Sequence, residues 1–161
     1  MKLLSNMAAF LSGLKRRLFL SGRSESVYFG GLRENEIVGA IANAVASNVA
    51  KLTPQVIRKT AAGTTIKNDK LSRLLEIRPN AENSTYDFLY KMASDLIYTS
   101  NAFAVVFFND DCSEITSIQP ITVTSHRIFE VDGVLYFKFI WEYDKKSYTV
   151  PYQFVIHIKG R

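Results

Sequence analysis

Residues 71–109, LSRLLEIRPNAENSTYDFLYKMASDLIYTSNAFAVVFFN, combine two helical patterns, a proline between them and a continuous apolar run. Three leucines share one face of a short first helix, and Asp69 stands where its side chain can cap that helix. Pro79 ends the helix, because the residue before a proline avoids helical angles. The stretch therefore predicts a helix, a break and a second element within forty residues.

The second helix is predicted over 85–99. Ser84 and Asp87 have the spacing of a capping box, and apolar residues recur on one broad face of the segment that follows. Residues 102–108 are apolar at every position, as in a central strand that is covered on both faces. Asn101 stands at the junction and suits a turn or helix C-cap, since asparagine tolerates left-handed angles.

An earlier helix is predicted over 35–52, capped by Asn35 and ended by Thr53-Pro54. It has two apolar faces, one with large and one with small side chains. The face with small side chains permits close approach of a neighbouring element, which we expect to belong to this chain and not to another subunit. Strands are predicted over 55–60 and 64–67, on either side of a turn. Large aliphatic residues occupy one helix face (Ile37, Ile41, Val45 and Val49), and alanines occupy the other (Ala42, Ala46 and Ala50).

The last third of the chain is rich in predicted strands. Asp132-Gly133 is a strong signal for a two-residue β-hairpin. The expected fold class is α+β, with amphipathic helices packed on a mostly antiparallel, meander-like sheet. The strands are predicted over 114–118, where Gln119-Pro120 ends the first, and over 126–131, 134–143, 147–150 and 154–158.

One predicted strand carries a row of mostly aromatic side chains on a single face. Such a row can stack nucleic-acid bases, as in sheet-type RNA binders. The glycine-aromatic-basic signature of those binders is missing, so we interpret the row as core. Its members are Leu135, Phe137, Phe139, Trp141 and Tyr143.

The composition is that of a folded protein. Of 161 residues, 47% are apolar, and no apolar run reaches the length of a membrane-spanning helix. The single cysteine, Cys112, excludes an intramolecular disulfide and fits a reducing compartment. We expect one α+β domain over 35–161, preceded by an arm at 1–34.

The arm carries most of the net charge of +5, because it holds six basic and two acidic residues. An amphipathic helix is predicted in residues 3–18, followed by a Gly- and Ser-rich linker over 21–31, and we expect the arm to be mobile. Lys15, Arg16 and Arg17 could contact DNA phosphates, a membrane surface or a partner. The alternative is a solvated helix end whose cations suit the helix dipole.

Other polar residues lack the partners in sequence that catalysis or metal binding requires. Asp110-Asp111 lack a third ligand nearby and are interpreted as a solvated turn, and Cys112 lacks an adjacent base that would make it a nucleophile. His126 and His157 lie in different predicted strands without ligand partners in sequence. No catalytic residue, cofactor site or metal site is therefore predicted.

Four segments, in order, resemble a known family. Residues 35–57 are similar to its first core helix and the leucine-x-proline-x-valine entry into a strand. Residues 71–106 are similar to its L-x-x-L-L-x-x-x-P-N helix pair and its G-N-A-Y-A strand. Residues 114–128 resemble its L-x-P-L-x-P-x-x-V segment, and 154–160 its V-x-H-I-K strand. The family is that of tailed-bacteriophage portal proteins, in the small-portal branch of siphophages and prophages.

The chain departs from the family pattern in three ways. Ser100 stands where glycine is usual, and Phe103 stands where tyrosine is usual. Family members also continue beyond the equivalent of Arg161 into stem helices, a clip that docks the packaging motor, and a crown. The resemblance therefore implies the first part of the portal wing, as a truncated piece or a relic.

The resemblance implies a non-enzymatic structural role. Portal subunits form a homo-oligomeric ring at one capsid vertex, through which DNA enters at packaging and leaves at infection. The implied partners are other portal subunits, the terminase, capsid or scaffold protein, head–tail adaptors and double-stranded DNA without sequence specificity. No membrane is implied. The implied location is the virion, and the host bacterial cytoplasm during assembly.

Two other classes of function are open to the sequence. One is a small α+β nucleic-acid-binding module that uses the aromatic sheet face and the basic arm. The other is an enzyme in which carboxylates, such as Asp95 or Asp110, converge in space with other groups. A structure with a pocket of perturbed carboxylates favours the enzyme, and base stacking on Trp141 and Phe139 favours the module.

Overall fold

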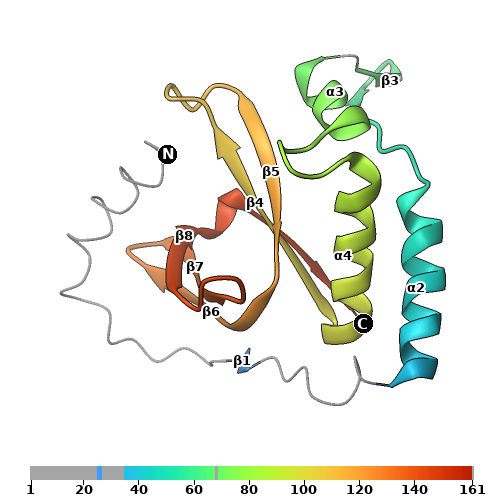
Figure 1. Ribbon diagram of the computed structural model, residues 1–161. Helices are drawn as coiled ribbons and strands as arrows, with labels where there is room; N and C mark the ends of the chain where they lie inside the picture. The colour runs from blue at the N-terminus through green and yellow to red at the C-terminus, as the bar shows by residue number, and fades with distance from the viewer. Residues whose placement is uncertain (1–24, 27–34, 68, 161) are drawn as a thin grey trace. The chain divides into compact units, whose positions relative to one another are not determined.

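Helices and antiparallel sheets make up the computed structural model, which describes residues 25–26, 35–67 and 69–160 (Figure 1). The predicted α+β fold class is confirmed. The described chain forms two compact units: unit 1 holds residues 25–26 and 122–155, and unit 2 holds residues 35–121 and 156–160. The region expected as one domain is thus shared between two units.

The three helices within the described residues all belong to unit 2, and each has the predicted N-cap. The Asn35 side chain accepts hydrogen bonds at the start of the first helix, and the Asp69 carboxylate accepts one from the Ser72 N–H. Ser84 and Asp87 form the complete capping box. The helices are α2 (Glu36–Ala50), α3 (Lys70–Ile77) and α4 (Thr85–Thr99).

Helix α4 lies between α2 and the sheet of unit 2 (Figure 1). The buried residues of α2 are three of its five alanines, Ala42, Ala46 and Ala50, so the predicted close approach through the small face is confirmed. The Tyr90 hydroxyl of α4 donates to the Asn43 side chain of α2 at 3.1 Å. On the face with the large aliphatic residues, Ile37, Ile41 and Val45 are exposed and Val49 is half-buried.

The three-stranded sheet of unit 2 has the order β5-β4-β9, so β4 is central as predicted. Ala102 and Ala104 of β4 pack with Phe88 and Met92 of α4 in the core of this unit. The small side chains on this strand face let the helix lie close to the sheet. The strands are β4 (Asn101–Phe108), β5 (Ile115–Ile121) and β9 (Val155–Lys159).

The prediction that Gln119-Pro120 ends a strand is wrong. β5 continues to Ile121, and Pro120 lies opposite Ala104 in the pairing with β4. β5 is an edge strand, with β4 on one side only. Proline is tolerated on an edge strand because its missing N–H can face away from the neighbouring strand.

The left-handed residue at the end of α4 is Ser100, with φ 56°, and not Asn101 as predicted. Asn101 instead begins β4, and its side-chain amide donates to the Thr99 carbonyl at 3.2 Å. The Ser100 carbonyl accepts from the Gly160 N–H at 2.7 Å, which joins this corner to the chain after β9. A glycine at position 100 would adopt the same angles without the Cβ clash.

We therefore expect Ser100→Gly to stabilise the protein by roughly 0.5–1 kcal/mol, since the left-handed penalty exceeds the added entropy of glycine in the unfolded chain. Urea unfolding measures this change. Ser94→Gly, inside α4, is the control and should destabilise by about 0.5 kcal/mol, the difference in helix propensity between serine and glycine. A loss of stability in Ser100→Gly would show that the serine side chain matters more than its backbone angle.

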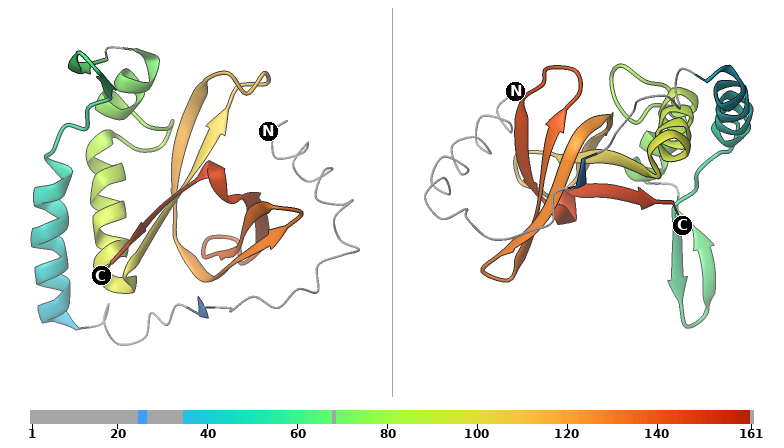
Figure 2. Two further views of the ribbon diagram at one scale, coloured as in Figure 1. Left: turned by 180° about the vertical axis from the view of Figure 1, so that it is seen from behind. Right: turned by 90° about the horizontal axis from the view of Figure 1, so that it is seen from below.

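A separate two-stranded hairpin follows α2. It consists of β2 (Ile57–Thr60) and β3 (Gly63–Ile66), joined as predicted by a short turn. All eight strand residues are exposed. The hairpin projects away from the helices of unit 2 (Figure 2).

Unit 1 is a four-stranded sheet with the order β1-β6-β7-β8. The Asp132-Gly133 hairpin is confirmed, with φ 51° and 78° at its two turn residues. Phe137 is fully buried at the centre of the sheet. The elements are β1 (Glu25–Ser26), β6 (Val123–Val131), β7 (Val134–Trp141), β8 (Ser147–Pro151) and a 3-10 helix at Tyr152–Phe154.

Two segments of the chain pair differently from a simple meander. Glu25 and Ser26, which lie in the stretch predicted as linker, pair with His126 and Ser125 of β6. After the 3-10 helix the chain leaves unit 1, and β9 joins β4 in unit 2. Neither pairing follows from local sequence, because both join segments far apart in the chain.

Candidate interaction surfaces

The basic residues singled out in the sequence, Lys15, Arg16 and Arg17, lie outside the described residues, as does the helix predicted over 3–18. Among the helices that the structure describes, none is long and apolar enough to cross a membrane.

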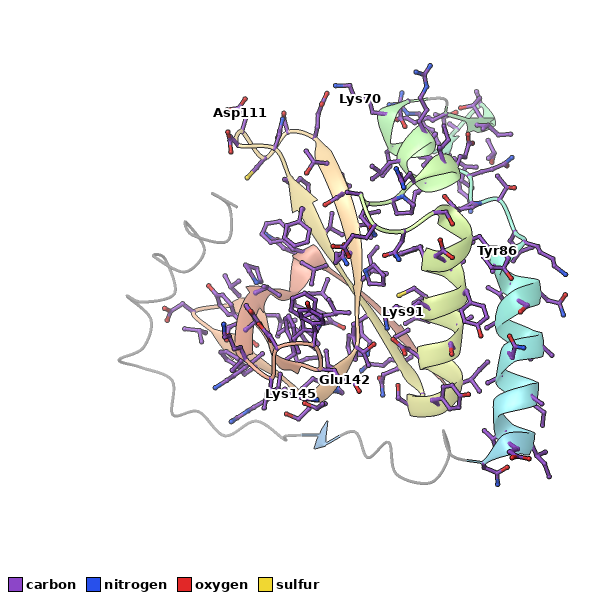
Figure 3. The ribbon with its side chains drawn as sticks, in the orientation of Figure 1. Lys70, Tyr86, Lys91, Asp111, Glu142 and Lys145 are labelled. Carbon is purple, nitrogen blue, oxygen red and sulfur yellow. The ribbon has the colours of Figure 1, made fainter. Side chains whose placement is uncertain are left out.

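The carboxylates Asp110 and Asp111 lie at the exposed turn between β4 and β5 (Figure 3). The Asn109 side-chain oxygen accepts from the Ser113 N–H at 2.8 Å, which closes the turn, and Cys112 is exposed with φ 54°. Over residues 35–67 and 69–160, no group of three or more His, Cys, Asp or Glu side chains is placed to hold a metal ion. The predicted interpretation as a turn agrees with this geometry.

The two histidines belong to different units, and each has structural surroundings. His126 is buried in unit 1, with its ring centroid 5.8 Å from that of Phe137. His157, in unit 2, shares a 2.9 Å hydrogen bond with the Asn101 side chain and packs on Phe103 at 4.3 Å. His157 thus helps to fix β9 against β4.

Asp95 is a buried carboxylate on α4, paired with Lys91 at 2.8 Å. Asp110 lies beyond the other end of β4, so Asp95 and Asp110 do not lie together within unit 2. The Asp95–Lys91 pair spans one helical turn, and Lys91 itself is partly exposed. Its geometry is that of an ion pair within a helix.

The aromatic row of β7 is core at its centre and exposed at its ends. Phe137 and Phe139 are buried and stack at 5.2 Å, and Tyr148 of β8 covers Phe139 at 5.7 Å. The core interpretation is therefore confirmed for these two and wrong for Leu135 and Tyr143, which are exposed. Because Phe139 is covered by other rings, it offers no free face on which a base can stack.

The carboxyl groups with shifted pKa values are in caps and turns. Hydrogen bonds from the side chain and backbone of Ser84 lower the pKa of Asp87, and the backbone N–H of Ser72 lowers that of Asp69. In unit 1, the Tyr148 hydroxyl donates to Asp144, which lowers the pKa of Asp144 and raises that of Tyr148. These shifts follow from local structure and do not mark a reaction centre.

The α4 capping box gives a testable pH dependence. The pKa of Asp87 in the folded chain lies below its ordinary value of about 3.9, so its ionised form favours folding. That stabilisation is complete above about pH 4 and is lost as the pH falls through the lowered pKa. In Asp87→Asn the side chain cannot titrate, so its thermal midpoint should fall less on acidification than that of the wild type. Asp111→Asn is the control, and parallel acid profiles for wild type and Asp87→Asn would contradict the expectation.

The sequence did not predict the most unusual surface of unit 2. Ile37, Ile41 and Val45 of α2 are 73%, 57% and 46% exposed. Residues 37–50 include no charged side chain. Large aliphatic side chains with this exposure, on a helix face without charged neighbours, form an apolar surface patch. The signal was present in the two apolar faces of the helix, but the sequence alone did not say which face the chain covers.

A second exposed apolar surface lies on the β2–β3 hairpin. Ile57 and Ile66 are cross-strand partners and are 49% and 65% exposed. Arg58 and Lys59 follow Ile57 on the same strand and are exposed as well. The hairpin therefore presents aliphatic contact area beside two cations.

Comparison with known proteins identifies a family for nearly all of the described chain. A model of the phage portal protein family matches residues 36–161. The matched region includes all three described helices and every described strand except β1. No curated protein sequence matches the chain at a significant level.

Proposed function

The chain belongs to the phage portal protein family, and we propose that it is a subunit, or the N-terminal part of a subunit, of a portal ring at the capsid vertex. The family is one of structural virion proteins and not of enzymes. The observation that carries the proposal is the family match over residues 36–161. In the proposed role, DNA passes through the ring during packaging and during ejection.

The fold supports this proposal at the four segments that resemble the family. Residues 35–57 hold α2 and the start of β2, and 71–106 hold most of α3, all of α4 and much of β4. Residues 114–128 cover β5 and part of β6, and 154–160 contain β9. In a structural subunit, such elements supply rigid packing surfaces and need no reaction centre.

The proposed partners follow from the same role. They are other copies of the subunit, the terminase, capsid or scaffold protein, head–tail adaptors and double-stranded DNA without sequence specificity. The proposed location is the virion, after assembly in the bacterial cytoplasm. Lys15, Arg16 and Arg17 are proposed to contact DNA or one of these proteins, because clustered cations favour phosphate-rich or acidic surfaces.

A packaging assay tests the proposed function. Deleting the gene that encodes this sequence from its phage or prophage should leave heads without packaged DNA. Nuclease-resistant genome copies, counted after induction, measure the loss, and the gene supplied in trans should restore them. Normal packaging in the deletion strain would overturn the proposal.

A binding assay addresses the nucleic-acid module. Fluorescence anisotropy with a labelled single-stranded oligonucleotide, repeated at several salt concentrations, measures any affinity of the chain. We expect Trp141→Ala to leave the anisotropy curve unchanged. A salt-dependent affinity that is lost in this variant would favour the module instead.

A further inference from the structure

The β2–β3 hairpin is an incomplete sheet. It projects from the helices of unit 2 (Figure 2), and all eight of its strand residues are exposed. Among the described residues, no third strand pairs with either of its edges. An isolated two-stranded hairpin is marginally stable in water, whereas a third strand with an apolar face gives independent stability. A further strand at one edge would therefore stabilise the hairpin.

The outer edge of β3 presents backbone groups for such a strand. The Lys67 N–H donates to the Val56 carbonyl at 2.8 Å, which makes these residues a hydrogen-bonded pair. Because hydrogen-bonded and non-hydrogen-bonded pairs alternate along an antiparallel ladder, the neighbouring Ile57–Ile66 pair is non-hydrogen-bonded. The N–H and C=O groups of Ile66, and of Thr64 two residues earlier, therefore point away from β2.

β3 also lacks the features that protect edge strands from pairing. Natural edge strands are protected by charged side chains, especially lysine, and by proline. β2 carries Arg58 and Lys59, and Pro54 precedes it, whereas β3 contains neither a charged residue nor a proline. Three of the four β3 residues are β-branched, which favours strand pairing. β3 is thus the edge to which a further strand can add.

We infer that an extended segment of another protein adds to this edge of β3, with aliphatic side chains on one face and acidic side chains on the other. The aliphatic face of the segment matches the Ile57–Ile66 pair, whose members are 49% and 65% exposed. Lys59 and Thr64 lie on the same face nearer the turn, because side chains alternate along a strand. An aliphatic residue beside Ile66 extends the isoleucine pair into a row across three strands.

The opposite face of the hairpin is cationic. Arg58 lies opposite Thr65 on this face, and Lys67 follows two residues after Thr65. Lys67 pairs with Asp69 at 3.4 Å, whereas Arg58 takes part in none of the ion pairs between described residues. A glutamate beside Thr65 lies two strand spacings, about 9.6 Å at the backbone, from Arg58. The arginine and glutamate side chains can meet across the short threonine, so an acidic residue fits this position.

The charge of the region selects the kind of partner. No acidic residue occurs between Glu36 and Asp69, whereas four basic residues do. Like charges on neighbouring strands destabilise pairing, so a second copy of this hairpin and the basic residues 1–24 are both disfavoured as the added strand. The occupant is therefore an acidic segment of a different protein. The inference goes beyond the proposed portal role and does not depend on it.

Amide hydrogen exchange with a synthetic probe tests the inference. The probe is a decapeptide of alternating glutamate and valine, and its control is a decapeptide of alternating lysine and valine. The glutamate probe should slow exchange at Thr64 and Ile66 about fivefold or more, the factor that one net hydrogen bond supplies. Exchange at Ile57 and Lys59, whose amides point to the other edge, should not change. The lysine peptide should have no effect.

A backbone variant and a matched control separate strand pairing from side-chain contact. Thr64→Pro removes an outward N–H but no bond to β2, so the probe should lose its effect at Ile66. Thr64→Val keeps that N–H and should bind the probe as the wild type does. Slow exchange at Lys67, whose N–H bonds to Val56, shows that the hairpin is intact in both variants.

A charge reversal tests the match between the acidic face and the hairpin. Arg58→Glu should weaken binding of the glutamate probe roughly two- to fivefold, as expected for an exposed cross-strand charge pair, and should let the lysine peptide bind. Lys138→Glu is the control, because Lys138 is an exposed strand residue of unit 1. This variant should bind both peptides as the wild type does.

Other results would overturn the inference. Unchanged exchange at Thr64 and Ile66 in the presence of the glutamate probe would exclude pairing at this edge. Equal binding of the two peptides would remove the charge match, and protection at Ile57 and Lys59 instead would place the added strand on β2. Protection by a short DNA duplex but not by the glutamate probe would assign the cations to phosphate contacts.

Discussion

Replacing Phe137 with alanine is expected to destabilise unit 1 by about 3–5 kcal/mol, the range measured for deletion of a fully buried phenylalanine. The Phe137 ring is fully buried. It packs against Phe139, His126 and Tyr152, with ring centroids 5.2, 5.8 and 6.4 Å away. Alanine leaves a cavity where these three rings meet. Because a domain's total stability is only about 5–15 kcal/mol, much of unit 1 should be unfolded at moderate temperature.

Near-ultraviolet circular dichroism and thermal unfolding measure this effect, since the aromatic signal of unit 1 should melt early. Leu135→Ala is the matched control, because Leu135 lies two residues earlier on the same strand and is 46% exposed. Leu135→Ala should lower the free energy of unfolding by well under half as much as Phe137→Ala. Equal losses in the two variants would mean that Phe137 is not the centre of the unit 1 core.

Replacing Ala46 with leucine is expected to destabilise unit 2 by about 1–3 kcal/mol, the usual cost of forcing extra methylenes into a packed interior. Ala46 is fully buried between α2 and α4. The larger side chain must push the two helices apart, which weakens the Tyr90–Asn43 hydrogen bond between them. Denaturant unfolding, followed by helical circular dichroism, measures the change.

Ala44→Leu is the matched control for this change. Ala44 lies in the same helix and is exposed, and the substitution is the same, so it should alter stability by less than about 0.5 kcal/mol. A large loss in Ala44→Leu with little loss in Ala46→Leu would mean that α2 packs through its large aliphatic face.

These two helix faces show why the sequence predicted α2 without predicting its surroundings. Apolar periodicity identifies a helix and its stripes, and both Ile37–Ile41–Val45 and Ala42–Ala46–Ala50 qualify. The choice between them depends on how closely α4 approaches, which is a property of tertiary packing. Alanine permits the closer contact, so the larger side chains are left outside.

Local signals were otherwise reliable. The caps at Asn35, Asp69 and Ser84 and the Asp132-Gly133 hairpin each depend on a few adjacent residues, and each was predicted correctly. Where the predictions were wrong, neighbouring strands or turn geometry decided the outcome. β5 continues through Pro120 because it is an edge strand, and the left-handed position falls on Ser100.

Long-range pairing was the least accessible part of the fold. The return of β9 to β4 and the pairing of Glu25–Ser26 with β6 depend on contacts that no local pattern encodes. The exposed apolar surfaces of unit 2 also depend on tertiary structure. The exposure of Ile57 and Ile66 depends on how the hairpin projects from the helices of unit 2, whereas the sequence shows only two short strands.

The central claim is that this sequence belongs to a subunit that assembles into a ring. Electron microscopy of the purified full-length gene product measures this directly, across a range of salt and protein concentrations. The expected result is closed rings with a central channel. Monomers under all conditions would contradict the claim.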